Sequence, residues 1–218
     1  MIITSKPLSL FWLKIGGYLV SKFFEIVYFN KLIIRPVEIK ADHSYLLSMN
    51  HFSFGDGFFG FYLAYQVLIK QDKMKRLYIM SLKKQMDKKW WLRHLGSFSI
   101  DPGKYSVKES LAYAAELLNK PGNLLLFFPQ GNLESCHIRT MQFQDGIAEI
   151  LPQVKGKCQL IWSSNIIEYF ESIKPSIYFN MLDCGTAENF DFEQFIQEVN
   201  LYHKESLQKN IRYTQEDQ

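Results

Sequence analysis

The stretch LLSMNHFSFGDGFFG, residues 46–60, places a histidine and an aspartate five positions apart in a run of apolar and small residues. Residues 45–50 are predicted to form a short strand, and residues 56–70 a buried helix. His51 then follows the end of the strand, and Asp56 lies just inside the helix. Loops at the carboxyl ends of strands form the clefts of α/β sheets, so both titratable groups are expected at a cleft.

Helical geometry alone would separate two such positions by about 140° around the helix axis, so a turn must precede Asp56. Gly55 supplies such a turn, and Gly57 leaves room beside it. The Asp56 carboxylate can then accept from one ring nitrogen of His51 and leave the other nitrogen free as a base. A capped helix start beside a surface histidine would give the same spacing without any chemistry.

Outward from this stretch, strand-like and helix-like segments alternate along the chain. The expected strands are 32–39, 45–50, 76–81, 96–101, 123–129, 157–165 and 176–182. After 56–70, helices are expected over 106–122, 146–154 and 191–209, and the first of these has a capping box of Ser106 and Glu109. This alternation predicts an α/β fold, a single domain with a mixed, mainly parallel sheet flanked by helices.

The N-terminal segment 7–34 is apolar, but Lys14, Lys22 and Glu25 interrupt it. No uncharged apolar run reaches the roughly 18 residues that a bilayer span requires, and no small-residue cleavage site follows, so neither a membrane span nor a signal peptide is expected. An N-terminal amphipathic helix within residues 1–31 is expected instead, either at a membrane interface or covering the core. Residues 32–218 are expected to form the main domain.

The composition is ordinary for a globular domain, with 47% hydrophobic and 22% charged residues and a net charge of +3. So small a net charge does not indicate a nucleic-acid-binding surface. The cysteines Cys136, Cys158 and Cys184 lie far apart without a CxxC pair, so neither a disulfide framework nor a zinc site is expected. Reduced thiols are consistent with a cytosolic compartment.

Asn50 and Ser53 extend the histidine–aspartate pair to the pattern N-H-x-S-x-x-D. This pattern resembles the first motif of the glycerolipid acyltransferase family, which includes the enzymes that acylate glycerol phosphate and lysophosphatidic acid. LLLFFPQGNLES (124–135) resembles the family motif F-P-E-G-T-R-S at the end of a buried strand. Weaker matches are GSFSIDPGK (96–104), similar to G-x-x-x-I-D-R, and FQDGIAEIL (143–151), similar to the helix start after the third motif.

The resemblance implies that residues 32–218 form an acyltransferase domain. It would move a fatty acyl group from acyl-coenzyme A or an acyl carrier protein to a hydroxyl of a lysophospholipid or another hydroxylated lipid. His51 would be the general base and Asp56 its orienting partner, while the Gly131 amide would stabilise the oxyanion. No metal or redox cofactor would be needed. A covalent route through Ser53 is less favoured, because no G-x-S-x-G elbow surrounds it.

The sequence departs from the family pattern where the family binds its acceptor. Gln130, Asn132 and Leu133 replace the Glu, Thr and Arg of the third motif, and Pro102 replaces the Arg of the second. An arginine side chain can bind a phosphate through two parallel hydrogen bonds. The loss of both arginines therefore weakens the case for an acceptor that carries a phosphate. Lys104 and Arg139 could supply the charge instead, or the acceptor could lack a phosphate, and Gln130 could still orient a hydroxyl. The predicted substrate-binding residues are Asn50, Ser53, Lys104, Gln130, Gly131, Asn132 and Arg139.

Two further features leave alternatives open. Trp162-Ser163-Ser164 stands where family members usually have a proline at a strand end. The altered third motif also fits a catalytically degenerate family member that binds lipid or a partner protein.

Residues 70–93 hold nine basic side chains against only Asp72 and Asp87. Basic residues around Trp90 and Trp91 are typical of an interfacial anchor, which predicts a peripheral protein on the cytoplasmic side of the membrane. The same surface could dock an acyl carrier protein or coenzyme A, or be an ordinary solvated face. The oligomeric state stays open. The predicted docking residues are Lys83, Lys84, Lys88, Lys89, Trp90, Trp91 and Arg93.

Overall fold

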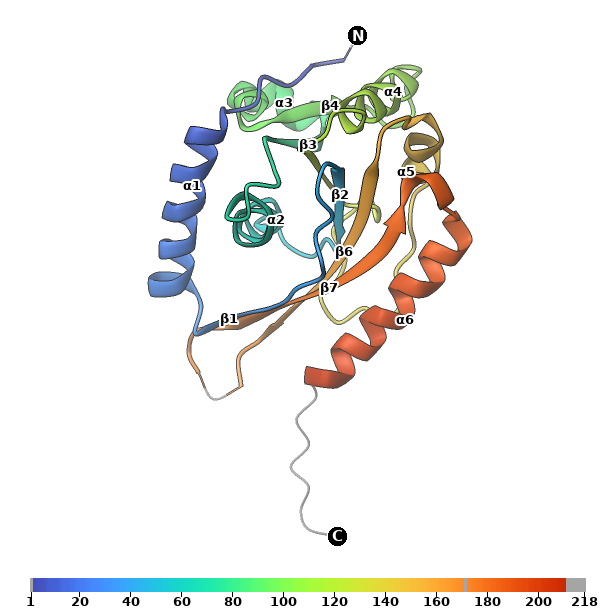
Figure 1. Ribbon diagram of the computed structural model, residues 1–218. Helices are drawn as coiled ribbons and strands as arrows, with labels where there is room; N and C mark the ends of the chain where they lie inside the picture. Colours follow the sequence, from blue (N-terminus) through green and yellow to red (C-terminus); the bar gives the residue numbers. More distant parts are fainter. Residues whose placement is uncertain (1, 171, 211–218) are drawn as a thin grey trace.

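A seven-stranded sheet organises the computed structural model, which describes residues 2–170 and 172–210. The strand order is β1-β7-β6-β2-β5-β3-β4; β6 and β7 pair antiparallel, and the other neighbours pair parallel (Figure 1). The predicted α/β class with a mixed, mainly parallel sheet is therefore confirmed. The strands are β1 (Lys31–Arg35), β2 (Ser44–Met49), β3 (Arg76–Leu82), β4 (Ser97–Ile100), β5 (Asn123–Phe127), β6 (Cys158–Glu168) and β7 (Ser176–Thr186).

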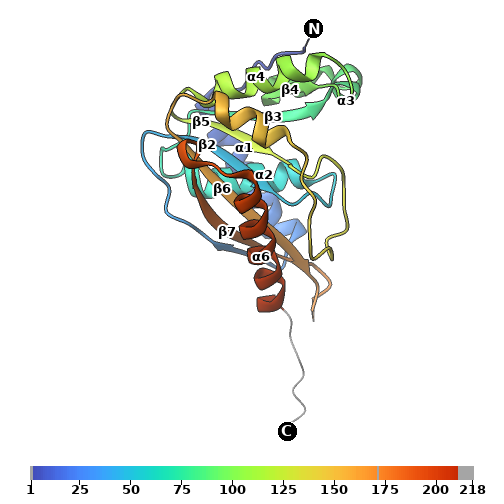
Figure 2. The same ribbon diagram turned by 90° about the vertical axis from the view of Figure 1, so that its right-hand side faces the viewer.

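Helices cover both faces of the sheet (Figures 1 and 2). One face carries α1 (Leu10–Phe23) with its π-helical extension η1 (Phe24–Tyr28), and α2 (Asp56–Ala64) with its extension η2 (Tyr65–Ile69). The other carries α4 (Ser106–Leu118), α5 (Gly146–Ile150) with the 3₁₀ turn η4 (Leu151–Gln153), and α6 (Phe192–Asn210). The connection from β3 to β4 contains α3 (Lys83–Lys88) and the 3₁₀ turn η3 (Trp90–Leu95), and η5 (Ala187–Asn189) precedes α6.

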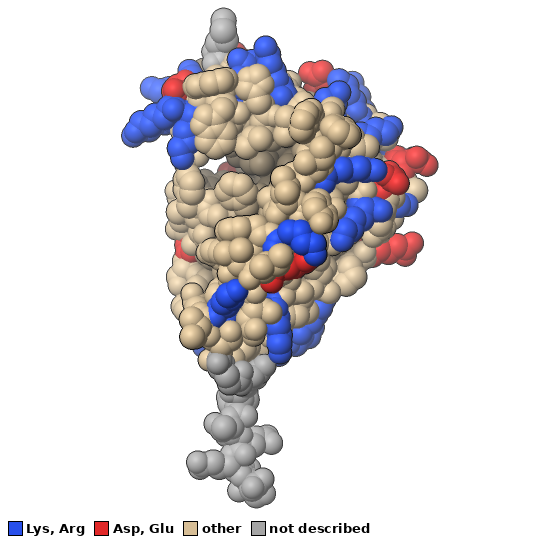
Figure 3. Space-filling view, turned by 90° about the vertical axis from the view of Figure 1, so that its left-hand side faces the viewer, with Lys and Arg blue, Asp and Glu red and all other residues tan. Residues whose placement is uncertain are grey.

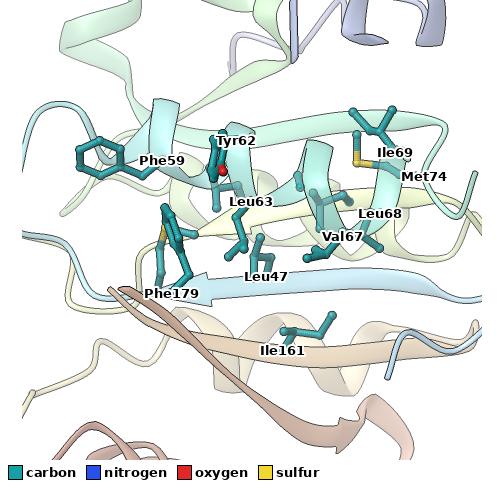
Figure 4. Close-up of a cluster of buried hydrophobic side chains, with 14 of the residues drawn as sticks. Leu47, Phe59, Tyr62, Leu63, Val67, Leu68, Ile69, Met74, Ile161 and Phe179 are labelled. Atoms are coloured by element: carbon teal, nitrogen blue, oxygen red, sulfur yellow. The ribbon is translucent and has the colours of Figure 1, made fainter. Parts of the chain in front are cut away.

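The central strands are apolar on both sides because each side faces a helical layer. In β5, Leu124 and Leu126 join the cluster under α2, whereas Leu125 and Phe127 join the cluster under α4 to α6. Figure 4 shows the first cluster, in which side chains of α2 and η2 pack against Leu47 of β2 and Ile161 of β6. The unbroken hydrophobic run of β5 is thus explained by burial on two faces.

The start of α4 differs from its predicted form. The helix begins at Ser106 itself, with Tyr105 at the N-cap and no side-chain capping bond, so the expected capping box with Ser106 as its cap is wrong. Ser110 instead ties this helix to the sheet, because its hydroxyl donates to the Ser99 carbonyl at 2.8 Å.

The N-terminal unit begins as an extended segment, and its helix starts only at Leu10. Ile3 N donates to Ser99 Oγ at 2.7 Å, and Ser99 N donates to Ile3 O at 2.9 Å, so this segment covers the outer edge of β4. An edge strand covered in this way cannot pair with another chain. Within the two described ranges, no helix combines the length and apolar character needed to cross a membrane.

Gly17 lets α1 lie close against the α2–η2 helix. A Cβ atom added at Gly17 would meet the Tyr65 ring at 2.1 Å, whereas one added at Gly16 would meet Phe61 only at 3.5 Å. We therefore expect G17A to lower the free energy of unfolding by about 1–3 kcal/mol through overpacking. G16A is the matched control, because it should leave stability unchanged or raise it by up to about 1 kcal/mol through helix propensity. Urea unfolding of both variants measures this, and equal effects would contradict the close approach.

Candidate active site

The loops that follow β2 and β5 meet at the carboxyl edge of the sheet. The two strands are parallel neighbours, with Ser48 in register with Phe127, so both chains leave the sheet side by side. Figure 2 shows the loop after β5 and the segment before α2 on the same side of the molecule. This register brings together two sequence motifs that lie about 75 residues apart in the chain.

His51 and Asp56 form a hydrogen-bonded pair. Asp56 Oδ2 accepts from His51 Nδ1 at 2.7 Å and from the backbone amides of Phe52 at 2.7 Å and Ser53 at 2.9 Å. Asp56 is fully buried at the first position of α2, where the helix dipole favours a carboxylate. The predicted turn before Asp56 is present, because Asp56 N donates to Ser53 O at 3.2 Å.

The geometry leaves one ring nitrogen of His51 available. The His51 side chain is 25% exposed, and within the described part of the chain no hydrogen bond occupies Nε2. The Phe128 ring stacks on the imidazole, with 4.4 Å between centroids and 29° between planes. The imidazole is thus fixed by a carboxylate at one nitrogen and by an aromatic face, while Nε2 can take a proton from an incoming group.

Asn50 was predicted to bind substrate, but both ends of its amide are already hydrogen-bonded. Its Nδ2 donates to Asn165 O at 2.9 Å, and its Oδ1 accepts from Asn165 N at 2.7 Å, so it continues the pairing of β2 with β6 beyond Met49. The side chain is 3% exposed. We correct its expected role from substrate contact to support of the loop that carries His51.

Gln130 needs the same correction. Its side chain is 3% exposed, Oε1 accepts from His51 N at 2.6 Å, and Nε2 donates to the Glu134 carboxylate. An amide with both ends engaged and almost no exposed surface is poorly placed to orient a substrate hydroxyl. It holds the backbone of His51 instead.

Gly131 does not present the free amide that was predicted for an oxyanion hole. Its N–H donates to Phe128 O at 3.1 Å, closing a turn in which Gly131 has a φ of +73°. A positive φ favours glycine, so the turn explains the residue type. Asn132 follows on the exposed surface, and the Ser53 hydroxyl accepts from Gly55 N at 2.9 Å within the turn before Asp56.

Lys104 and Arg139 are both exposed, and the described structure gives neither side chain a contact with His51 or Asp56. Lys104 follows β4, three strands from β2 in the sheet. Arg139 follows Ile138, whose carbonyl oxygen accepts from His203 Nε2 of α6 at 3.1 Å. Their predicted role as replacement charges stays a prediction.

An apolar cavity of about 410 Å³ lies between α1–η1 and the start of α2, and its lining includes Gly55, the residue before Asp56. Volumes of this size are typical of ligand pockets. Of the phenylalanines near His51, Phe58 and Phe59 line it. The complete lining is Leu19, Val20, Phe23, Phe24, Tyr28, Gly55, Phe58 and Phe59.

The basic segment is divided by β3. Lys70, Lys73, Lys75 and Arg76 lie at or before the amino end of the strand, whereas Lys83, Lys84, Lys88, Lys89 and Arg93 follow its carboxyl end, at the edge that holds His51. Lys89 Nζ lies 4.6 Å from the centroid of the Phe54 ring, which places this second group next to the turn before Asp56. The nine residues therefore do not form one patch, but the docking residues predicted from 83 to 93 adjoin the site.

Exposed aromatic and aliphatic side chains lie on η3 and on the outer face of α1 and η1. Trp90 is 70% exposed and Trp91 45%. Figure 3 shows this face as largely apolar, with basic side chains at the upper left and along the right of the view, a few charged side chains within it, and a hollow beneath the upper group. The exposed apolar side chains of α1 and η1 are Phe11, Trp12, Ile15, Tyr18, Leu19, Phe23, Ile26, Val27 and Tyr28.

The Trp162-Ser163-Ser164 stretch has a structural explanation. Trp162 Nε1 donates to Ser164 Oγ at 2.8 Å, and that hydroxyl bonds His203 Nδ1 at 3.0 Å, which anchors α6 to β6. Burial lowers the pKa of His203, so a neutral ring fits this network.

The cysteines are all free, and burial raises the pKa of Cys158 to about 11, which keeps that thiol protonated. Among the described residues, no group of three or more His, Cys, Asp or Glu side chains could hold a metal ion.

Sequence reasoning missed three residues that position His51: Phe128, Glu134 and Asn165. Glu134 N donates to His51 O at 2.8 Å, and Asn165 supplies the backbone that Asn50 binds. Phe128 and Glu134 occupy the first and last positions of the third-motif match, so their place in it was the available signal; Asn165 carried none.

Comparisons with known proteins agree with this geometry. A family model described as Acyltransferase matches residues 33–162, which include His51, Asp56 and Gln130. No curated protein sequence matches the chain. The fold is similar to that of the 1-acyl-sn-glycerophosphate (LPA) acyltransferase PlsC from Thermotoga maritima. That crystal structure matches with a TM-score of 0.61 and 12% sequence identity over 94% of this chain and 81% of the other.

Proposed function

Since this chain belongs to the acyltransferase family, we propose that it is a peripheral membrane O-acyltransferase that acts on hydroxylated lipids. The observation that carries the proposal is the His51–Asp56 pair, which leaves Nε2 of a partly exposed imidazole free, while an apolar cavity lies at the start of the helix that carries Asp56. The acyl donor is a thioester of coenzyme A or of an acyl carrier protein. The acceptor is a lysophospholipid or another lipid with a hydroxyl group.

The proposed reaction is a direct transfer. His51 Nε2 removes the proton from the acceptor hydroxyl while that oxygen attacks the thioester carbonyl carbon. The tetrahedral intermediate then collapses, the C–S bond breaks, and His51 returns the proton to the leaving thiolate. Asp56 keeps Nδ1 protonated and stabilises the imidazolium between the two steps, as an orienting carboxylate does in acyl-transfer triads. All transferred atoms come from the two substrates, so the proposal needs no metal or redox cofactor.

The apolar cavity supports a lipid substrate. Its walls come from α1, η1 and the first turn of α2, and Gly55 in its lining is the residue before Asp56. An acyl chain in this cavity would gain about 25 cal/mol for each Å² of apolar surface removed from water. We propose that the cavity holds an acyl chain of the donor or of the acceptor.

A substrate panel tests the function. Purified protein is incubated with labelled acyl-coenzyme A or acyl carrier protein and with lysophosphatidic acid, lysophospholipids that have larger headgroups, and a phosphate-free hydroxylated lipid. Esterified lipid with release of free thiol is the expected product. Exclusive use of lysophosphatidic acid would show that a phosphate is required despite the lost arginines. Tight lipid binding without turnover on any acceptor would refute catalysis and favour the binding protein.

Membrane association is a separate prediction. K84Q/K88Q should weaken binding to vesicles with anionic lipid about thirtyfold, because each basic residue at such a surface contributes about 1 kcal/mol. K75Q/K120Q is the matched control; it removes the same charge at the amino ends of β3 and β5, away from the site. Vesicle sedimentation at low and high salt measures both. Equal loss for the two pairs, or no salt dependence, would remove the electrostatic anchor from the proposal.

The two tryptophans test the apolar part of the anchor. W90A/W91A should weaken binding to neutral vesicles as well, because indoles partition into the membrane interface. Unchanged vesicle binding would leave α1 and η1 as the apolar contact. The free cysteines are consistent with the proposed cytoplasmic side of the membrane.

A further inference from the structure

We propose that Gln130 and Glu134 act as one coupled pair that positions the backbone of His51, and that each residue type requires the other. The inference rests on the proposed function of His51 as the general base. It adds a role for Glu134 and changes the role of Gln130 from substrate contact to positioning. The third motif then serves this chain as a clamp on the loop after β2.

The two residues hold both polar groups of the His51 backbone. Gln130 Oε1 accepts from His51 N at 2.6 Å, and Glu134 N donates to His51 O at 2.8 Å. The Gln130 amide nitrogen also donates to the Glu134 carboxylate, which closes a ring of hydrogen bonds through the three residues. Gln130 is nine-tenths or more buried, so water cannot replace these bonds freely.

The hydrogen bonds that join His51, Gln130 and Glu134 explain why position 130 holds a glutamine and not a glutamate. Gln130 must accept from an N–H at one end and donate to a carboxylate at the other, which an amide does and an ionised carboxylate cannot do. A glutamate at 130 would accept from His51 N but would meet the Glu134 carboxylate without a proton to share. Two carboxylates in contact destabilise each other's charged forms. The departure at 130 and the acid at 134 therefore make sense together.

Positioning matters here because the imidazole has little freedom of its own. Its Nδ1 is bound to Asp56 and its face lies on Phe128, so a shift of the His51 backbone would move Nε2 relative to the acceptor. A misplacement of about 1 Å costs on the order of 10²-fold in rate. Such a loss appears in kcat, because no substrate contact is removed.

Three variants test the coupling: Q130E, E134Q and the exchange Q130E/E134Q. Q130E should lower kcat about 10- to 100-fold with the acceptor KM nearly unchanged, because the two carboxylates push the clamp apart. E134Q should keep kcat within about threefold, because a glutamine at 134 still offers a carbonyl oxygen to Gln130. The exchange should also recover to within about threefold of the wild type, because the carboxylate now at position 130 would accept both from His51 N and from the side-chain amide now at position 134.

A rise in acceptor KM with unchanged kcat in Q130E would overturn the inference in favour of a direct substrate contact. Full activity of Q130E would refute the coupling between the two residues. Failure of Q130E/E134Q to recover kcat would refute it as well. Thermal unfolding of each variant separates misplacement from loss of fold, since recovery by exchange of two side chains is not expected from a general packing defect.

A readout without turnover keeps this test independent of the proposed reaction. In protein with labelled histidine, the imidazole NMR signals of His51 should shift in Q130E and return in the exchange variant. Unmoved signals would overturn the positioning role even if catalysis were lost. If the signals respond as expected but the wild type acylates no lipid, the proposed function is refuted. The positioning of His51 by Gln130 and Glu134 is then still supported.

Discussion

Replacing His51 with alanine is expected to lower kcat for acyl transfer by about 10²- to 10⁴-fold, the usual contribution of a positioned base. H51A removes the group that takes the hydroxyl proton, yet it keeps the backbone N–H and C=O that Gln130 and Glu134 bind. The acceptor KM should change little, because the lost interaction belongs to the transition state. Steady-state kinetics with the acceptor found in the substrate panel measure this.

H43A is the matched control. His43 precedes β2 at the amino end of the strand, whereas His51 follows its carboxyl end, so the same substitution is made at opposite edges of the sheet. His43 Nδ1 lies 2.6 Å from the Ala41 carbonyl oxygen. We expect H43A to retain wild-type turnover and H51A to unfold at a similar temperature. Full turnover by H51A would refute the assignment of the base.

The fold could be predicted because its signals are local. Each of the seven expected strands is present, and continuous apolar runs such as residues 124–127 identified strands buried on both faces. The His51–Asp56 contact was predictable for the same reason, since five residues and two glycines decide it.

The roles of Asn50 and Gln130 could not be predicted locally. Asn50 binds Asn165, 115 positions away, and Gln130 binds His51, 79 positions away, so their partners depend on strand order and register. Motif resemblance suggested substrate contacts for these residues, but a polar side chain beside a catalytic residue can equally hold the loop in place. Burial distinguishes the two roles, and sequence does not give burial for polar residues.

The division of the basic segment shows a related limit. Charge counting over residues 70–93 treats the segment as one surface, but β3 carries the chain from one edge of the sheet to the other within it. A strand of seven residues spans about 23 Å, which is beyond the screening length of physiological salt. Only the group after the strand, from Lys83 to Arg93, adjoins the site.

Replacing Asp56 should lower kcat nearly as much as replacing His51, and the same variant should also lower the free energy of unfolding. In D56N the amide oxygen can still accept from Phe52 N, Ser53 N and His51 Nδ1, but the negative charge that stabilises the imidazolium is gone. We expect kcat to fall by about 10²- to 10⁴-fold, as for a neutral replacement of an orienting carboxylate.

D56N should also unfold more easily than the wild type. Asp56 Oδ1 is buried and has no hydrogen-bond partner among the described residues, so the new NH₂ group would sit there without an acceptor. An unsatisfied buried donor costs about 1–3 kcal/mol, and the favourable charge at the start of α2 is lost as well. Urea unfolding of D56N beside its kinetics measures both effects.

D191N is the matched control, because Asp191 Oδ1 likewise accepts a backbone N–H at a helix start, from Gln194 at 2.8 Å, but is exposed and precedes α6 on the other face. Its free energy of unfolding should change by no more than about 0.5 kcal/mol, as for most surface substitutions. If D56N were as stable and as active as D191N, the carboxylate would be neither the orienting partner of His51 nor a needed acceptor for the turn. The role of the pair as a base would then have to rest on the imidazole alone, whose ring orientation only the stacking on Phe128 would fix.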